Sequence, residues 1–241
     1  MKGFASIKIK INQKLYLKDP EQTELGRNII QNSILLIDEL GFEAFTFKKL
    51  ATHIHSTEAS IYRYFENKHN LLVYLTSWYW SWLEYQIDYQ IHNIEDPKRC
   101  IEIALSVITD INQQDDAFEY INEAALHRIV VAESLKTYHT KSVDEENKDD
   151  FFRSYKSLCN KLVELFEQVN PEYPFAKALS STVIESAHQQ IFLASHLPRL
   201  TDFSMHDSAQ DYAPITQYLE HLVFTQLLSP LPEGCHLKKT D

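Results

Sequence analysis

Glycine and cysteine are both scarce in this sequence of 241 residues. The four glycines, Gly3, Gly26, Gly41 and Gly234, lie far apart along the chain. P-loop and Rossmann proteins need several clustered glycines to bring the backbone close to a phosphate, so both classes are excluded. The three cysteines form no Cys-x-x-Cys pair and are too few for a disulfide framework. We therefore expect a chain that folds through its hydrophobic core in a reducing cytoplasm.

Long apolar runs and signatures of catalysis are missing as well. The longest apolar run spans 71–75, whereas a membrane span needs about 20 apolar residues. No apolar segment of a secretory signal follows the first lysines. The eleven histidines show no zinc-binding spacing, and no Gly-x-Ser-x-Gly nucleophile motif is present. The sequence predicts no enzyme, no metal site, no cofactor and no membrane segment.

The charge is unevenly distributed along the chain. The formal net charge is −11, of which residues 1–72 contribute +2 and residues 73–241 contribute −13. A slightly basic head on a strongly acidic body is an asymmetry that by itself points to no particular function.

Residues 1–22 form an extension that precedes the helical part of the sequence. Ile7, Ile9 and Ile11 alternate with polar residues, which is typical of a strand and would suit a β-hairpin turning near Asn12. The extension also has five lysines, Lys2, Lys8, Lys10, Lys14 and Lys18. Two interpretations stay open: the lysines track DNA phosphates as a basic arm, or the extension packs on its own domain because its isoleucines need burial.

From about Thr23 onward, apolar residues recur at helical spacing. The first helix ends at Gly41, and the others are expected near 46–54, 57–65, 67–92, 97–111, 116–136, 149–169, 175–197 and 211–228. The polar, acidic stretch 141–150 is expected to be an exposed loop. The predicted fold class is therefore all-α. We expect an extension (1–22), a DNA-binding domain (23–72), a larger helical domain (73–230) and a tail (231–241).

Two short helices follow the first one within residues 46–65. A short helix, a tight turn and a second short helix make a helix-turn-helix, whose second member enters the major groove of DNA. The local sequence reads Leu-Gly-Phe-Glu-Ala-Phe-Thr over 40–46, and Thr-Glu-Ala-Ser-Ile-Tyr-Arg-Tyr-Phe-Glu-Asn-Lys over 57–68. Over about 47 residues this resembles the DNA-binding domain of TetR/AcrR-type bacterial transcription regulators.

The resemblance implies which residues touch DNA. Helix caps, lysines and tyrosines would hold phosphates, and the first turn of the third helix would read base edges. These residues are Thr46, Lys48, Lys49, Thr57, Glu58, Ala59, Ser60, Tyr62, Tyr64 and Lys68. For both tyrosines, packing within the domain is the alternative.

The sequence departs from the family pattern at the turn. The family usually has Gly-Val-Ser where this chain has His55, Ser56 and Thr57. Histidine tolerates a left-handed backbone better than most residues, so the turn can form. Glu58 either accepts a hydrogen bond from a cytosine amino group or only favours the helix dipole.

The acidic body resembles the family's effector-binding and dimerisation domain in layout only. The resemblance implies a pocket for a small apolar or aromatic effector, with Trp78, Trp82, Tyr85, Phe118, His127 and Tyr155 as candidate lining residues, although core packing is the more common role of such residues. It also implies a homodimer formed by the last two long helices, with Ala178, Thr182, Val183, Ser186, Leu219, Val223 and Leu227 at the interface. A dimer is needed because two recognition helices must reach successive major grooves.

Together these features predict a cytoplasmic transcriptional regulator that binds an approximately palindromic DNA operator. The resemblance implies repression that a small-molecule effector relieves. The alternative is a TetR-like helical sensor or scaffold that does not bind DNA, which Glu58 and the weak charge of the head would suit.

Overall fold

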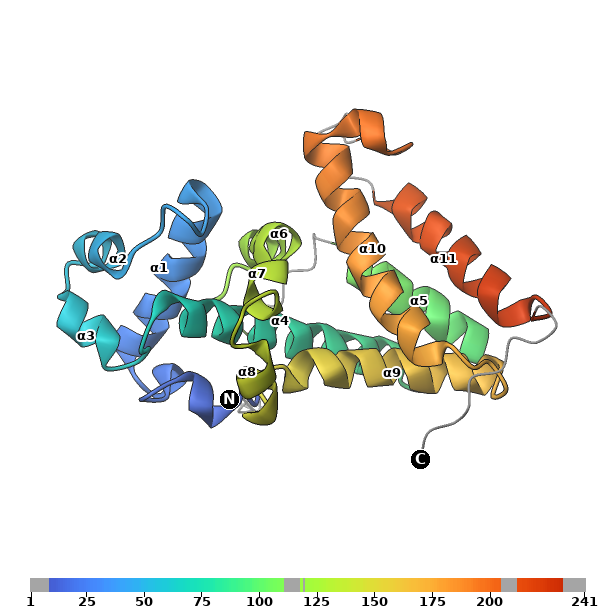
Figure 1. The fold of residues 1–241 in the computed structure, drawn as a ribbon, viewed down its shortest axis with the longest axis horizontal. Helices are drawn as coiled ribbons and strands as arrows, with labels where there is room; N and C mark the ends of the chain where they lie inside the picture. Colours follow the sequence, from blue (N-terminus) through green and yellow to red (C-terminus); the bar gives the residue numbers. More distant parts are fainter. Residues whose placement is uncertain (1–8, 111–117, 119, 205–211, 232–241) are drawn as a thin grey trace, which may run out of the picture. The chain divides into compact units, whose positions relative to one another are not determined.

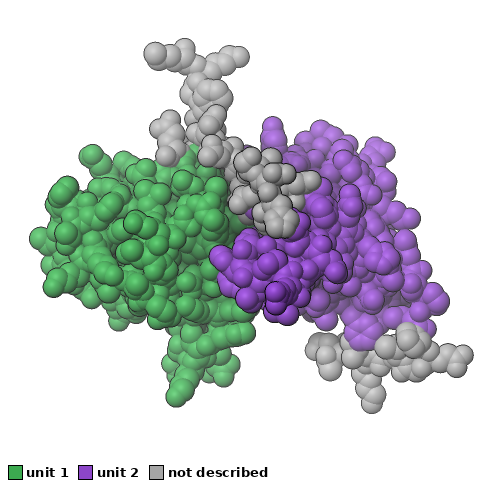
Figure 2. Space-filling view, turned by 90° about the horizontal axis from the view of Figure 1, so that it is seen from above, with its two compact units in different colours: residues 1–82, 111–156 green, residues 83–110, 157–241 purple. Residues whose placement is uncertain are grey.

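The computed structural model describes residues 9–110, 118, 120–204 and 212–231 of the chain, and in this part every regular element is a helix (Figure 1). The described residues fall into two compact units (Figure 2). Unit 1 comprises residues 1–82 and 111–156, and unit 2 comprises residues 83–110 and 157–241. The predicted all-α fold is confirmed.

Unit 1 begins with the three helices of the predicted DNA-binding domain, α1 (Glu24–Leu40), α2 (Phe47–His53) and α3 (Glu58–Tyr62). The residues expected to delimit them do so. Gly41 ends α1 with a φ of 76°, a conformation that glycine adopts without strain. Thr46 and Thr57 cap α2 and α3 by accepting hydrogen bonds from backbone N–H groups in the first turn, each at 3.2 Å.

The extension packs on this domain, and the expected β-hairpin is wrong for its described part. Residues 13–15 and 20–22 form 3-10 helices instead, while residues 1–8, including Ile7, Lys2 and Lys8, lie outside the described residues. The Leu15 side chain is fully buried, and the backbone N–H of Leu17 donates to the carbonyl oxygen of Tyr64 at 2.8 Å. One backbone hydrogen bond to an adjacent helix end replaces the expected strand pairing.

The next long helix, α4 (Lys68–Ile91), passes from unit 1 into unit 2. Within unit 1 its burial exceeds the predicted stripe, because every residue from Leu71 to Trp80 is buried. Toward its end the stripe fails: Tyr89 is 70% exposed. A helix that is covered on all sides cannot be recognised from a one-sided apolar pattern.

Three further helices complete unit 1: α6 (Glu123–Glu133), α7 (Leu135–Tyr138) and α8 (Val143–Lys148). The break expected within 116–136 falls at Ser134, and residues 111–117 and 119 lie outside the described residues. The acidic stretch expected as a loop contains α8, which is exposed but helical. Its first turn holds Asp144, Glu145 and Glu146, and acidic residues favour a helix N-terminus.

Unit 2 contains the end of α4 together with α5 (Pro97–Thr109), most of α9 (Arg153–Val169), α10 (Ala176–His196) and α11 (Ala213–Leu228). The helix α11 packs on both α5 and α10. Hydrogen bonds join Thr109 to Thr216 at 2.6 Å, and the Asn170 amide to the Leu227 carbonyl at 2.8 Å. Among the described helices, none has the length and apolar character needed to cross a membrane.

Candidate nucleic-acid interface

The α2–α3 corner is built as a compact helix-turn-helix. The turn between the helices places His55 at a φ of 52°. This left-handed conformation is the one that the family's glycine adopts at this position, and histidine tolerates it better than most residues do. The backbone N–H of Ser56 then donates to the carbonyl oxygen of Ala51 at 2.8 Å and closes the turn. Beneath the corner, Leu50 and Ile61 are fully buried, so the two helices are fixed relative to one another.

Most of the residues predicted to touch DNA lie on the exposed side of this corner. Ser60 is half-buried, and the exposed residues are Thr46, Lys48, Lys49, Thr57, Glu58, Ala59 and Tyr62. The Lys49 ammonium donates to the carbonyl oxygen of Ala44 at 2.8 Å, so part of its hydrogen-bonding capacity is used locally. The exposed caps and α3 N-terminus can donate to phosphates and base edges.

The two tyrosines of the motif have different environments. Tyr62 is 48% exposed and its ring packs edge-on against Phe47, with centroids 5.1 Å apart. Tyr64 is only 3% exposed, and its hydroxyl hydrogen-bonds the Thr23 hydroxyl at 2.7 Å. Tyr62 is therefore presented to solvent, whereas Tyr64 joins the α1 cap to the end of α3.

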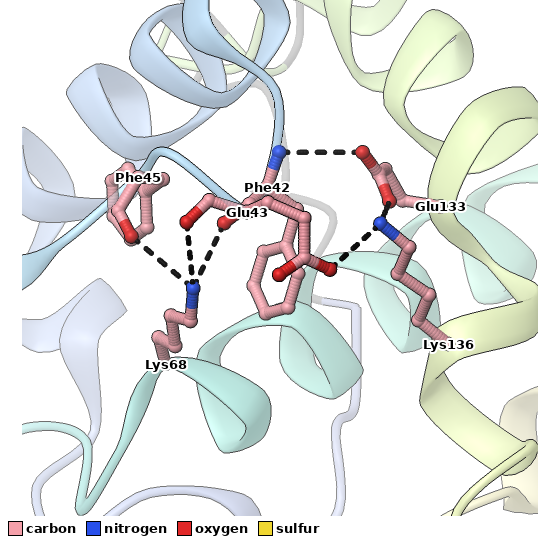
Figure 3. Close-up of polar contacts among 6 residues, drawn as sticks. All are labelled: Phe42, Glu43, Phe45, Lys68, Glu133 and Lys136. Atoms are coloured by element: carbon pink, nitrogen blue, oxygen red, sulfur yellow. Dashed lines mark hydrogen bonds and ion pairs between the residues drawn. The ribbon is translucent and has the colours of Figure 1, made fainter.

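Lys68 is held by the backbone between α1 and α2. Its ammonium donates to the carbonyl oxygens of Phe42 at 3.0 Å, Glu43 at 3.2 Å and Phe45 at 3.3 Å (Figure 3). It also lies 4.6 Å from the centre of the Phe42 ring. An ammonium has three N–H donors, and three carbonyls already accept from them. In this structure Lys68 stabilises the turn that leads into α2.

The same turn is tied to α6 and α7 from the other side. Glu133 accepts from the Phe42 backbone N–H at 3.2 Å, and Lys136 bridges Glu133 and Glu43 at 2.7 and 3.0 Å (Figure 3). The hydrogen bond from Lys136 lowers the pKa of Glu43, and the hydrogen bond to Glu133 raises the pKa of Lys136. Both groups therefore stay charged at neutral pH. Sequence spacing gave no signal for this contact, because its partners lie 91 and 93 residues apart.

A comparison with family models identifies the domain. Residues 29–75 match the model of bacterial regulatory proteins, tetR family, a stretch that runs from within α1, through α2 and α3, into α4. Residues 29–75 therefore form a DNA-binding domain of the tetR type. Comparison with curated protein sequences finds no match.

Solved structures share the fold of this chain at low sequence identity. The crystal structure of AibR in complex with isovaleryl coenzyme A and operator DNA is 15% identical, with a TM-score of 0.55 over 82% of this chain and 98% of that one. The fatty acid degradation regulator FadR from Bacillus halodurans is 18% identical, with a TM-score of 0.55 over 81% and 92%. Superantigen PfiT is 13% identical, with a TM-score of 0.53 over 88% and 97%. At these identities the likeness shows a common fold.

Four of the six predicted effector-pocket residues, Trp78, Trp82, Phe118 and His127, lie in an aromatic cluster centred on α4. Trp78 and Trp82 are buried and stacked, Phe118 packs edge-on against Trp78, and His127 hydrogen-bonds the Tyr79 hydroxyl. Tyr155 is placed elsewhere in unit 1, against Trp80 at 5.1 Å between centroids. Tyr85 belongs to unit 2, where it stacks on Tyr89.

The predicted dimer-interface residues divide by exposure. Ala178 and Thr182 are exposed and Ser186 is half-buried on α10. The remaining four, Val183, Leu219, Val223 and Leu227, are buried within unit 2. An apolar stripe at helical spacing shows that a face is covered, but the covering surface here is the chain's own α5 and α10. The exposed flanks that remain include Tyr218 and Leu228, which are 40% and 56% exposed.

Proposed function

We propose that this regulator acts in the cytoplasm as a homodimeric repressor, and that a small-molecule effector releases it from an approximately palindromic operator. One observation carries the proposal: the domain that matches the tetR model presents two capped helix N-termini and an exposed tyrosine on one corner. Helix N-termini, threonine hydroxyls and tyrosine hydroxyls are common donors to DNA phosphates. The function is that of a DNA-binding switch and not of an enzyme.

The structure supports different roles for the predicted contacts. Thr46, Lys48 and Tyr62 suit phosphate binding, because all three are exposed at the corner. Glu58, Ala59 and Thr57 lie at the start of α3 and suit contact with base edges. Tyr64 and Lys68 position these elements from inside the domain, through Thr23 and the three carbonyls described above.

Effector control is supported by direct ties between the DNA-binding helices and α6. Arg128 forms a two-pronged ion pair with Asp38 of α1, at 2.9 and 2.7 Å, and α6 also bears Glu133 of the turn contact. The same helix carries His127 of the aromatic cluster. A ligand that binds one arrangement of α6 better than another would therefore change the DNA-binding corner.

Binding to genomic DNA fragments tests the proposal, with fluorescence anisotropy at several salt concentrations as the measurement. We expect Lys48→Gln to weaken binding to all fragments and to reduce the salt slope by about 1, because one phosphate contact is lost. Tyr62→Phe, which keeps the packing on Phe47, should also weaken all binding. Lys141→Gln changes an exposed lysine between α7 and α8 and serves as the control.

The second candidate is a TetR-like sensor or scaffold that does not bind DNA. It is favoured by the fold shared with a protein described as a superantigen, PfiT, and by the exposed carboxylate of Glu58 at the start of α3. Equal, weak binding of the wild type and of Lys48→Gln to every fragment at low salt would support this candidate.

A further inference from the structure

Two of the chain's three tryptophans bury indole N–H groups that have no acceptor. Trp78 is 0% exposed and Trp82 is 2% exposed, and neither indole nitrogen has a hydrogen-bond partner. The third, Trp80, is equally buried, but its indole nitrogen is not in this situation. Buried donors are nearly always satisfied in folded proteins, because leaving one unpaired forfeits its hydration without replacement.

The two donors lie on one face of α4, a single turn apart. The indole rings are stacked, with centroids 6.4 Å apart and planes inclined by 15°. Phe118 packs edge-on against Trp78 at 5.1 Å between centroids, and Tyr79 is tilted against Trp82 at 5.9 Å. Two further aromatic rings therefore pack against the two indoles, whose planes are nearly parallel and whose N–H donors have the same chemistry.

The surroundings favour a neutral acceptor over an anion. In the described part of the chain, the cations that lie over aromatic rings are Lys18 over Tyr64 and Lys68 over Phe42, and neither ring belongs to this group. Glu123 is buried on α6, one helical turn before His127, whose ring packs against Tyr79 of this group. Burying a carboxylate without a cation is costly, whereas a carbonyl oxygen needs only hydrogen-bond donors.

We propose that Trp78 and Trp82 donate their indole N–H groups to the carbonyl oxygen of a neutral, mostly apolar ligand, such as an ester, lactone, ketone or amide. The aromatic rings would hold the apolar part of the ligand, and the two donors would select for the carbonyl group. This inference rests on the effector-controlled function proposed above and names the chemical class of that effector.

Nitrogen-15 labelling of the three indoles tests the inference in the intact wild-type chain. The titrants are methyl esters of straight-chain acids with four to twelve carbons, matched γ-lactones and methyl ketones, the corresponding free acids, and alkanes of equal length. We expect two of the three indole N–H resonances to move downfield with an ester, lactone or ketone, because these protons gain an acceptor. The alkanes should leave their proton shifts nearly unchanged.

Calorimetry on variants assigns the effect to the two donors. Trp78→Phe and Trp82→Phe should each weaken binding of the best carbonyl compound about fivefold, the worth of one neutral hydrogen bond, and leave alkane binding unchanged. Trp80→Phe is the matched control, because it removes a buried tryptophan of the same helix and should not change the preference for the carbonyl. If a variant fails to fold, the wild-type titration still decides.

Three results would overturn the inference: equal affinity for esters and matched alkanes, tighter binding of the free acids than of the esters, or no binding of any carbonyl compound at millimolar concentration. These measurements contain no DNA. If the chain binds esters but no operator, the proposed DNA-binding function is wrong and the proposed ligand class stands. If it binds an operator but none of the carbonyl compounds, the ligand class is wrong and the DNA-binding function stands.

Discussion

The buried side chain of His188 gives the stability of the molecule a pH dependence that can be measured. His188 on α10 is 3% exposed, and burial lowers its pKa from 6.5 to about 4. The unfolded chain therefore binds a proton more readily than the folded one between these values. The contribution of the neutral His188 side chain to the free energy of unfolding is therefore fully present above pH 6.5. It is lost as the pH falls from 6.5 toward 4.

We expect His188→Leu to flatten this part of the stability profile. In the wild type, the free energy of unfolding should fall between pH 7 and pH 4 by up to about 3 kcal/mol more than in the variant. Urea unfolding at four pH values measures the difference. His196→Gln, at the exposed end of the same helix, is the control and should keep the wild-type slope; identical profiles for wild type and His188→Leu would refute the account.

Residue types that define local backbone geometry could be predicted from the sequence. Gly41, Thr46 and Thr57 act through hydrogen bonds and dihedral angles within a few residues, so their roles follow from local spacing. Gly26, in contrast, has a role that could not be predicted from local spacing. A Cβ atom there would lie 2.1 Å from the carbonyl oxygen of Pro20, and this close approach of the extension to α1 has no signature in the sequence.

At the scale of elements, the extension behaves as a structural part of unit 1. Besides the buried Leu15, Tyr16 packs edge-on against Tyr74 of α4 at 6.1 Å between centroids. Lys14 pairs with Asp149, after α8, at 2.6 Å. These contacts support the alternative in which the extension packs on its own domain.

The packing role predicts a difference between two neighbouring leucines. Leu15→Ala should lower the free energy of unfolding by about 2–5 kcal/mol, because it empties a fully buried site. Leu17→Ala should change it by less than about 0.5 kcal/mol, since Leu17 is 67% exposed. Thermal and urea unfolding of both variants provide the measurement, and similar losses for the two would mean that the extension is not packed as described.

The tie between α1 and α6 makes a second prediction about elements. A double-mutant cycle on Asp38 and Arg128 should give a coupling energy near 1 kcal/mol, because the pair is two-pronged and Asp38 is only 24% exposed. The same cycle on Lys14 and Asp149, which are 60% and 53% exposed, should give a value close to zero. Equal coupling energies for the two pairs would mean that the ion pair between α1 and α6 is no stronger than an ordinary surface ion pair.

Helix positions were more predictable than the surfaces that the helices cover. Periodicity placed α10 and α11 to within a few residues, but it could not tell that the chain's own helices bury Val183, Leu219 and Val223. Likewise, the family motif marked Lys68 and Tyr64, and only the structure shows their bonds to carbonyls and to Thr23. Burial by distant parts of the chain is a tertiary property that local spacing does not encode.

In the whole molecule, three features act together: the DNA-binding corner, a set of ties to α6, and an aromatic cluster on α4 and α6. All three lie in unit 1. The dimer that a two-fold operator requires would use surfaces of unit 2 that remain exposed, such as the flank with Ala178 and Thr182.

Footprinting of the intact protein on genomic fragments, including the region upstream of its own gene, tests the central claim most directly. The account predicts a protected two-fold site whose half-sites are about 34 Å apart, with protection that falls steeply as salt is raised. Lack of protection at low salt, by a folded chain shown to be dimeric, would contradict the account and leave the TetR-like sensor as the function to pursue.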